Sequence, residues 1–373
     1  MKKKKVLSMI VTSILTVALI AGCSSAKKTE EGNKTDGGTK VEEGTKTEEG
    51  AIVKLGLGQS TSIAKSKDAD GADVTALGQV DTIMAAVGFD KDGKVVSVTI
   101  DNAQTKVEFN KDLTLKSDVN AELKTKVELK DGYGMKKASA IGKEWYEQIA
   151  ELEKWMVGKT VEEIKAMKTV KKDDSHPAVP DEADLKSSVS ISVEGYIAVV
   201  EEAYKNAVEV KGGAVKVGLG HNVSIAKSKG LATKDGKEVL PLAQVDTVMV
   251  ASAFDKDGKV AAALIDNAQT KVNFDNTGKV TSDKAAELKT KVELKEEYGM
   301  KKASAIGKEW YEQAAALQDW MVGKTVSEIT GMKTVKKDDS HPAVPDEADL
   351  KSSVSISVQD YLAALEESSK NAK

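Results

Sequence analysis

The feature that most constrains the fold of this chain is an internal duplication. Gln79–Asp81 returns as Gln244–Asp246, and from there an offset of 165 residues holds to the end of the sequence. Before this point the offset is 162, so the second copy carries three extra residues in one loop. A period this long indicates tandem domains and not a solenoid. Each copy has about 155 residues, which is enough to bury a core of its own.

The two copies have not changed evenly along their length. Met167–Val193 is identical to Met332–Val358 over 27 residues, and Tyr133–Gln148 matches Tyr298–Gln313. The segment 59–78, by contrast, has drifted from its counterpart and differs from it in length. We interpret the identical blocks as pointers to a site that both copies share.

Strand signals open each copy. Thr82–Phe89 and Val95–Ile100 are rich in β-branched and small apolar residues, and they flank the turn signal Asp90–Gly93. This pattern predicts a β-hairpin. Asp-x-Asp-Gly also opens calcium-binding loops, but the closing Glu of an EF-hand is missing, which disfavours calcium here.

Helix signals follow the hairpin. Apolar side chains recur at helical spacing at Ile141, Trp145, Ile149, Leu152 and Met156. We interpret this stripe as core. Thr160–Glu163 fits a capping box that opens the next helix, and Thr325–Glu328 repeats it. The fold class predicted is α+β, with two tandem homologous domains, each a mainly antiparallel sheet with packed helices.

The first 50 residues differ from the rest. Residues 1–22 combine a basic start, an apolar run shorter than the ~20 residues of a membrane span, and small residues before Cys23, as in a secretory signal. Ile20–Cys23 resembles the bacterial lipobox, which implies a lipidated Cys23 on the extracytoplasmic face of the cell membrane. An uncleaved membrane anchor is the alternative. Residues 23–50 predict a disordered acidic tether, and the two domains follow at 51–210 and 211–373.

Composition excludes several functions. Cys23 is the only cysteine, so the chain can form no intramolecular disulfide, cysteine-ligated iron–sulfur cluster or Cys-x-x-Cys-His haem site. Removing residues 1–22 takes away four Lys and no acid, and moves the formal net charge from −4 to −8, which disfavours nucleic-acid binding. With three His in the chain, no metal site is predicted. A stand-alone enzyme is disfavoured, because the sequence offers no complete set of nucleophile and acid–base residues.

The long identical block ends in a polar pattern of period two. In Asp181–Ser192, Val189, Ile191 and Val193 alternate with serines, which predicts a half-buried strand presenting hydroxyls. The apolar positions from Tyr196 to Ala203 then predict a closing helix. Spacing alone favours a polar strand face with nothing attached.

A resemblance gives these serines a role. The spacings Asp184-x-x-Ser187-x-x-Ser190 and Asp349-x-x-Ser352-x-x-Ser355 resemble the Asp-x-x-Ser/Thr-Gly-Ala-Thr/Ser motif of FMN-binding domains. The resemblance implies that Ser190 and Ser355 are esterified by the phosphate of FMN, two FMN groups per chain, through a separate (ApbE-like) FMN transferase. Asp184, Ser187, Asp349 and Ser352 would form the surrounding motif. Here Ser-Val replaces the central Gly-Ala, and Ser stands where Thr is usual.

The whole repeat is similar to the tandem FMN-binding lipoproteins of Gram-positive bacteria (PplA-like). This similarity implies an electron carrier that passes electrons from a membrane quinol oxidoreductase system to extracellular acceptors. Trp145 and Trp310 could then lie against a flavin ring. The alternative is a surface lipoprotein without flavin that binds a solute or the cell wall.

Three further patterns carry weaker signals. Lys172–Pro177 has one His with nearby acids on a proline-flanked loop, which is more typical of a loop than of a metal site. Gly56–Gly58 and Gly218–Gly220 are too short for a dinucleotide fingerprint and are typical of strand ends or bulges. Asp101–Thr105 is a polar cluster after a strand that either lines a ligand site or caps a turn.

Overall fold

The structure is a computed structural model that describes residues 51–71 and 74–373. The predicted signal segment, Cys23 and the tether lie outside the described residues. The described residues, which contain both repeats, belong to one compact unit. Within the described ranges, no helix combines the length and apolar character needed to cross a membrane.

The first repeat builds an antiparallel sheet of four strands in the order β3-β2-β1-β6. Its strands are β1 (Ile52–Ser62), β2 (Leu77–Phe89), β3 (Val95–Glu108) and β6 (Val208–Ala214). The β2–β3 turn follows from its residues, because an Asp90 carboxylate oxygen accepts the N–H groups of Asp92 and Lys94 and Gly93 adopts a φ of 77°. The predicted hairpin is confirmed, with strands longer than the sequence indicated.

Helices cover one face of this sheet. They are α1 (Lys126–Leu129), η1 (Lys130–Tyr133), α2 (Trp145–Met156), α3 (Val161–Lys165) and α4 (Glu194–Lys205), with a short ladder of β4 (Thr169–Val170) and β5 (Val179–Pro180) between α3 and α4. The apolar stripe of α2 is buried against β2 and β3, which confirms its interpretation as core. Ile141 lies before this helix and not on it. The Thr160 capping box and the closing helix are also confirmed.

The second repeat follows the same plan. Its main sheet has the order β11-β10-β7, from β7 (Lys216–Ser224), β10 (Leu242–Phe254) and β11 (Val260–Asn273). Its helical elements are α5 (Lys291–Leu294), η2 (Lys295–Tyr298), α6 (Trp310–Met321), α7 (Val326–Thr330) and α8 (Gln359–Lys370), and its short strands are β8 (Ala232–Lys234), β9 (Lys237–Val239), β12 (Thr334–Val335) and β13 (Val344–Pro345). The three extra residues of this copy fall in the loop region that carries the exposed β8–β9 hairpin.

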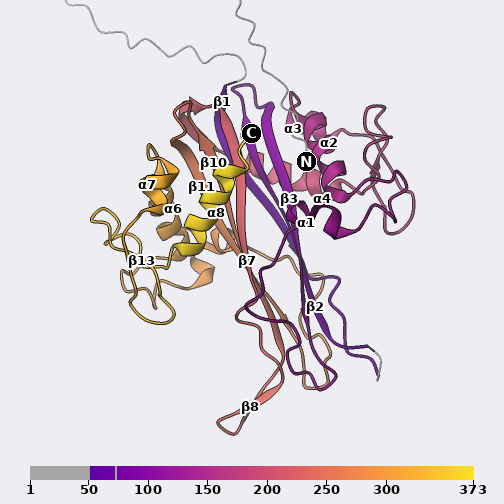
Figure 1. The fold of residues 1–373 in the computed structure, drawn as a ribbon, viewed down its shortest axis with the longest axis vertical. Coiled ribbons are helices and arrows are strands. Elements are labelled where there is room, and N and C mark those ends of the chain that lie inside the picture. Colours follow the sequence, from indigo (N-terminus) through magenta and orange to yellow (C-terminus); the bar gives the residue numbers. More distant parts are fainter. Residues whose placement is uncertain (1–50, 72–73) are drawn as a thin grey trace, which may run out of the picture. The chain divides into compact units, whose positions relative to one another are not determined.

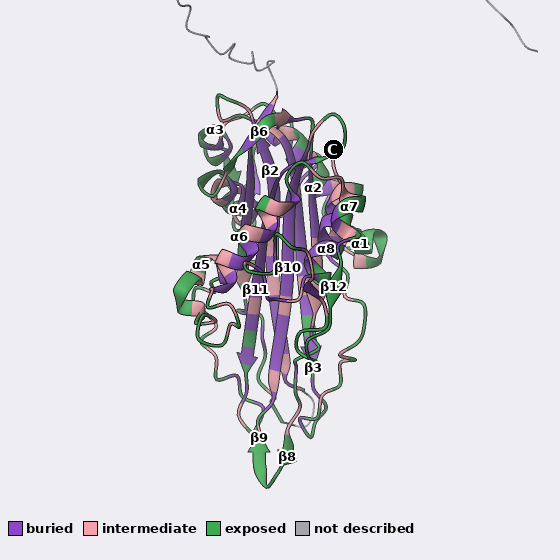
Figure 2. Ribbon diagram, turned by 90° about the vertical axis from the view of Figure 1, so that its left-hand side faces the viewer, coloured by how far each residue is buried: buried purple, intermediate pink, exposed green. Residues whose placement is uncertain are grey.

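The two sheets pack face to face between two layers of helices. Figure 1 shows α1–α4 on one side, α6–α8 on the other, and the strands of both repeats between them. Two buried clusters join the sheets: one unites Met84 with Met249, and the other brings Phe109 and Phe274 together with ring centroids 5.1 Å apart. The strands are accordingly buried on both faces (Figure 2). The α+β class with mainly antiparallel sheets is confirmed, and the two copies share core between them.

The glycine pairs lie inside strands and not at their ends or at bulges, so that prediction was wrong. A Cβ on Gly56 or Gly58 of β1 would overlap the backbone of α4, and one on Gly218 or Gly220 of β7 would overlap α8. Glycine is required here because each closing helix lies directly on the strand backbone.

The strand predicted over the serine block is also wrong. Residues 183–188 form consecutive turns, in which the N–H groups of Ser188 and Val189 donate to the carbonyl of Leu185, and residues 189–193 belong to no strand. Val189 and Val193 are buried, as the alternation predicted, but Ser188 and Ser190 are buried with them. The period-two pattern therefore belongs to an irregular segment whose apolar side chains are buried in the core. Its backbone forms the hydrogen bonds of turns and not those of a strand ladder.

Candidate functional site

The predicted attachment serine of the first repeat lies beside the first turns of α2. Ser190 is 9% exposed. Its N–H and its hydroxyl both face the side-chain oxygen of Gln148, at 2.8 and 3.3 Å. Gln148 is fully buried, and its amide nitrogen donates to the Ser139 hydroxyl and to the Lys143 carbonyl. The Ser190 hydroxyl is thus held in place by a fixed acceptor.

The second repeat reproduces this arrangement. Ser355 is 8% exposed, and its N–H and hydroxyl face the side-chain oxygen of Gln313 at 2.8 and 3.2 Å. Gln313 in turn donates to Ser304 and to the carbonyl of Lys308. The identical sequence blocks Tyr133–Gln148 and Met167–Val193 therefore meet in space, which explains why these two blocks carry one site.

The other motif residues lie on the outside of the turn. Asp184, Ser187, Asp349 and Ser352 are all exposed. In the described part of the chain, no side-chain hydrogen bond joins the Asp, the first Ser and the last Ser of either motif; the Asp184 carbonyl instead accepts from the Ser188 hydroxyl. The structure brings the last serine of each motif together with a glutamine, and leaves the first two motif residues free to meet solvent.

A buried lysine lies over the aromatic residues next to this site. Lys126 Nζ is 4.9 Å from the ring centroid of Tyr133 and 5.3 Å from that of Trp145. Burial lowers the pKa of Lys126 to about 8, against the opposing charge of Asp81. Lys291 repeats these contacts in the second repeat, and its pKa is lowered to about 8 for the same reason. A partly desolvated cation of this kind favours a neighbouring anion.

The tryptophans are core residues. Trp145 and Trp310 are each 2% exposed. Their ring N–H groups donate to the hydroxyls of Tyr196 and Tyr361 at 2.9 and 3.1 Å. Buried and hydrogen-bonded in this way, neither ring presents a face to a bound molecule.

A phosphoester at Ser190 would keep one of the two hydrogen bonds that this serine makes with Gln148 and lose the other. Esterification replaces the hydroxyl proton with the phosphate, so the bond from the Ser190 N–H to Gln148 would remain, while the ester oxygen could no longer donate to Gln148 Oε1. The turn that carries Asp184 and Ser187 is held by short-range hydrogen bonds within 182–189. Leu185 and Val189 of this segment belong to the buried core with β2 and β3, so a group on Ser190 would have to leave on the side of Asp184 and Ser187, which are exposed.

Two weaker sequence patterns are resolved differently. The Lys172–Pro177 segment is an exposed loop in which the His176 imidazole faces the Asp173 carboxylate at 2.8 Å, so the loop prediction is confirmed. Asp101–Thr105 lies inside β3 and not after a strand. Asp101 is buried there, and one of its oxygens accepts the N–H of Val127 at the start of α1.

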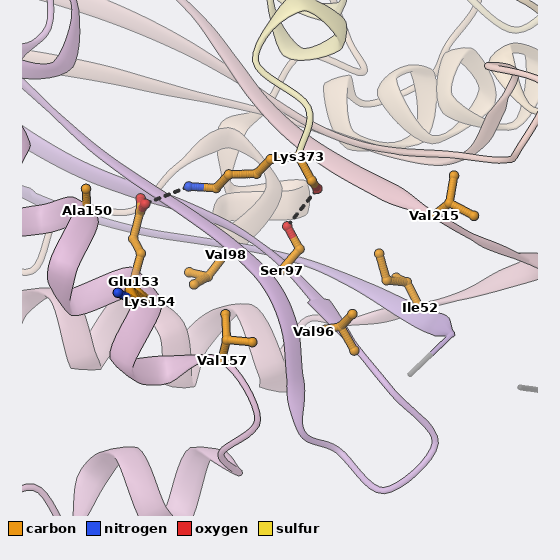
Figure 3. Close-up of a pocket in the computed structure, with 10 residues that line it drawn as sticks. All are labelled: Ile52, Val96, Ser97, Val98, Ala150, Glu153, Lys154, Val157, Val215 and Lys373. Carbon is orange, nitrogen blue, oxygen red and sulfur yellow. Dashed lines mark hydrogen bonds and ion pairs between the residues drawn. The ribbon is translucent and has the colours of Figure 1, made fainter. Parts of the chain in front are cut away.

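A pocket of about 360 Å³ lies where the second repeat ends against the first. In Figure 3 the Lys373 ammonium faces the Glu153 carboxylate at 2.6 Å, and the Ser97 hydroxyl donates to the Lys373 carbonyl. Glu153 also accepts the N–H of Ile100 at 2.6 Å. The polar groups named here in this pocket bond to one another, so we interpret the pocket as part of the contact between the repeats and not as a binding site.

Sequence reasoning missed one cluster of titratable groups. His221 lies among Asp101, Glu128 and Glu367, which come from both repeats. The one signal in the sequence was the difference between Gly56–Gln59 and Gly218–His221, since only the second copy has an imidazole at that position.

Comparisons with known protein families, with curated proteins and with solved structures find no match to this chain. Function is therefore argued from the residues themselves.

Proposed function

We propose that the chain is a lipid-anchored extracytoplasmic flavoprotein that carries one covalent FMN on Ser190 and one on Ser355. It would relay electrons from a membrane quinol oxidoreductase system to extracellular acceptors. The observation that carries the proposal is the repetition of one motif at one place in both repeats. Each motif ends in a nearly buried serine hydroxyl that faces a buried glutamine, directly before the closing helix.

The chemistry demands little of this chain. Attachment needs a hydroxyl at a defined place, and the transferase supplies the activation. Redox chemistry belongs to the isoalloxazine ring of the bound group. The chain would hold the modified residue in place through the hydrogen bond from the Ser190 N–H to Gln148 Oε1. The cations Lys126 and Lys291 lie over Trp145 and Trp310, the first residues of α2 and α6. These residues come one helical turn before the two glutamines, so the lysines favour negative charge near that end of each helix.

The test is the intact mass of the full chain produced with and without an active FMN transferase. We expect the transferase to add the mass of two FMN esters, with yellow colour that survives denaturation. Ser190→Ala and Ser355→Ala should each remove one addition, and the double variant should remove both. A peptide map that recovers both serines unmodified in the presence of active transferase overturns the proposal.

The neighbouring serines provide a matched control. The Ser192 and Ser357 hydroxyls accept the N–H groups of Ala178 and Ala343 and so have a structural role. Ser192→Ala and Ser357→Ala should leave both additions in place. Loss of flavin in these variants would mean that any change in the turn blocks attachment.

A second candidate is a surface lipoprotein without flavin that binds a solute or the cell wall. The inward direction of the Ser190 hydroxyl favours this candidate, as does the burial of Val189, where the family motif has Ala. An unchanged mass in the same experiment selects it.

A further inference from the structure

Four titratable side chains meet where β3 of the first repeat runs beside β7 of the second. The Nε2 atom of His221 lies 3.3 Å from Glu367 Oε1, 3.5 Å from Asp101 Oδ2 and 3.9 Å from Glu128 Oε2. Asp101 and Glu128 belong to the first repeat, and His221 and Glu367 to the second. The His221 and Asp101 side chains are each 6% exposed, whereas that of Glu128 is 36% exposed.

The cluster is strongly unbalanced in charge. Three carboxylates surround one imidazole, so the group is net negative even when His221 is protonated. Among residues 51–71 and 74–373, no lysine forms an ion pair with Asp101, Glu128 or Glu367. Burial by itself lowers the pKa of His221, but the hydrogen bond to Asp101 and the surrounding negative charge outweigh it and raise this pKa. Burial also raises the pKa of Glu367.

The positions suit a small divalent cation. A tetrahedral ion with bonds of 2.0–2.1 Å holds its ligand atoms about 3.3 Å apart. The separation of His221 Nε2 from Glu367 Oε1 is already close to this value, and Glu128, which lies 3.9 Å from Nε2 and is partly exposed, has to move inward. One ligand atom each from Glu128, His221 and Glu367 lies within 4.8 Å of the others.

The ligands are oriented by hydrogen bonds from behind. The second carboxylate oxygen of Glu367 accepts the backbone N–H of His221 at 2.8 Å. The second oxygen of Asp101 accepts the N–H groups of Asn102 and Val127. Such second partners fix the direction of metal ligands and raise affinity. Two hollows, of about 280 and 490 Å³, both reach His221 and give an ion a way in.

The chain contains its own comparison site. Gln59 pairs with Met84 in the register β1–β2, as His221 pairs with Met249 in β7–β10, so the two residues are equivalent. The carboxylates Asp266, Glu293 and Glu202 occupy the places of Asp101, Glu128 and Glu367. Gln59 donates its side-chain amide to Glu293 at 3.0 Å and its N–H to Glu202 at 3.0 Å. At this equivalent place Gln59 donates hydrogen bonds to two carboxylates and offers no imidazole nitrogen that could bind a metal ion.

We propose that Glu128, His221 and Glu367 form a site for one first-row divalent cation of the Zn²⁺ type, bridging the two repeats, with the Asp101 carboxylate beside them adding negative charge. Imidazole nitrogen with carboxylate oxygens is a ligand set that suits Zn²⁺ and its neighbours. The equivalent site with Gln59 lacks the imidazole and binds no such ion. Because ligands come from both repeats, the ion would fasten one edge of the joint.

The test uses Zn²⁺ as the probe on the full chain purified in detergent. After chelation, reloading and removal of free ion, we expect one Zn²⁺ per chain by elemental analysis. His221→Gln should bring this to none while the circular dichroism spectrum stays unchanged, because it copies the environment of Gln59. Gln59→His should raise the content to two.

The remaining histidines are the control. His176 and His341 face only an Asp each on exposed loops. Replacing both by Gln should leave one Zn²⁺ bound. A wild-type chain that retains no Zn²⁺, or a His221→Gln variant that retains it, overturns the proposal. Flavin attachment is read from mass at Ser190 and Ser355, so failure of either proposal is seen separately.

Discussion

The two edges where the repeats meet differ in a single kind of residue at their centre. At one edge His221 faces three carboxylates, and at the other Gln59 donates hydrogen bonds to two of the three equivalent carboxylates, Glu293 and Glu202. An amide donates hydrogen bonds but carries no positive charge, so Gln59 does not offset the effect of burial on the pKa values of the neighbouring acids. Glu202 there has a pKa raised to about 7 and Asp266 one raised to about 6, chiefly by burial. The two edges therefore differ in electrostatics although their strands pair in the same register.

A second difference separates the same two edges. Glu153 accepts from Ile100 and pairs with Lys373, whereas its counterpart Gln318 donates to the carbonyl of Ile265. The place of Lys373 is taken by Val208 in the other half. The polar joints of the two repeats have diverged, while the serine sites on the outer layers have not.

The largest effect should come where the two halves are alike. Gly58→Ala and Gly220→Ala each place a Cβ against the backbone of α4 or α8. We expect either change to lower the free energy of unfolding by about 3 kcal/mol, since the helix has to move off the strand. Urea denaturation followed by circular dichroism measures this.

Gly132→Ala is the control, since its Cβ would meet nothing within 4 Å. Because core is shared, each variant should still unfold in one transition. Two separate unfolding transitions, or a loss of stability in only one of the two variants, would contradict the expectation that the two repeats depend equally on these glycines.

A smaller effect should distinguish the edges through pH. The pKa of Glu202 is raised in the folded state from 4.5 to about 7, so the folded chain binds more protons and loses stability as pH rises through this window. Glu202→Gln should remove that loss, by roughly 1–2 kcal/mol after allowance for solvent screening. Urea midpoints at pH 4.5 and pH 7 give the measurement.

The His221 edge should respond in a higher range. Since the pKa of His221 is raised, its contribution is present below the ordinary value of 6.5 and is lost as pH rises through the folded pKa. An unaltered pH dependence between 4.5 and 7 in Glu202→Gln would contradict the assignment of the lower window to the Gln59 edge.

The smallest effect concerns the matching capping boxes. The Thr160 and Thr325 hydroxyls each accept the N–H three residues on, and the Glu at that position reaches back. Thr160→Ala and Thr325→Ala should each cost about 1 kcal/mol. Thermal unfolding should show equal shifts, and unequal shifts would extend the divergence of the halves to their helices.

Much of the fold could be predicted because it is written in local patterns. The β2–β3 hairpin follows from its turn residues, α2 from its apolar stripe, and α3 from its capping box. The serine block misled because Val189 and Val193 alternate as in a strand, while the hydrogen bonds that decide its course are those of turns. Periodicity reports which side chains are buried and not which backbone conformation buries them.

By itself, the sequence determined that one pattern occurs twice, where the central hairpin and the main helices of each copy form, and where the candidate flavin motif falls. The tertiary structure alone decided that the two sheets share core and that His221 meets Glu128 and Glu367. It also decided that the Ser190 hydroxyl faces Gln148. The physical reason is that these contacts join residues far apart in the chain, and only the packing of one element on another brings their atoms within reach.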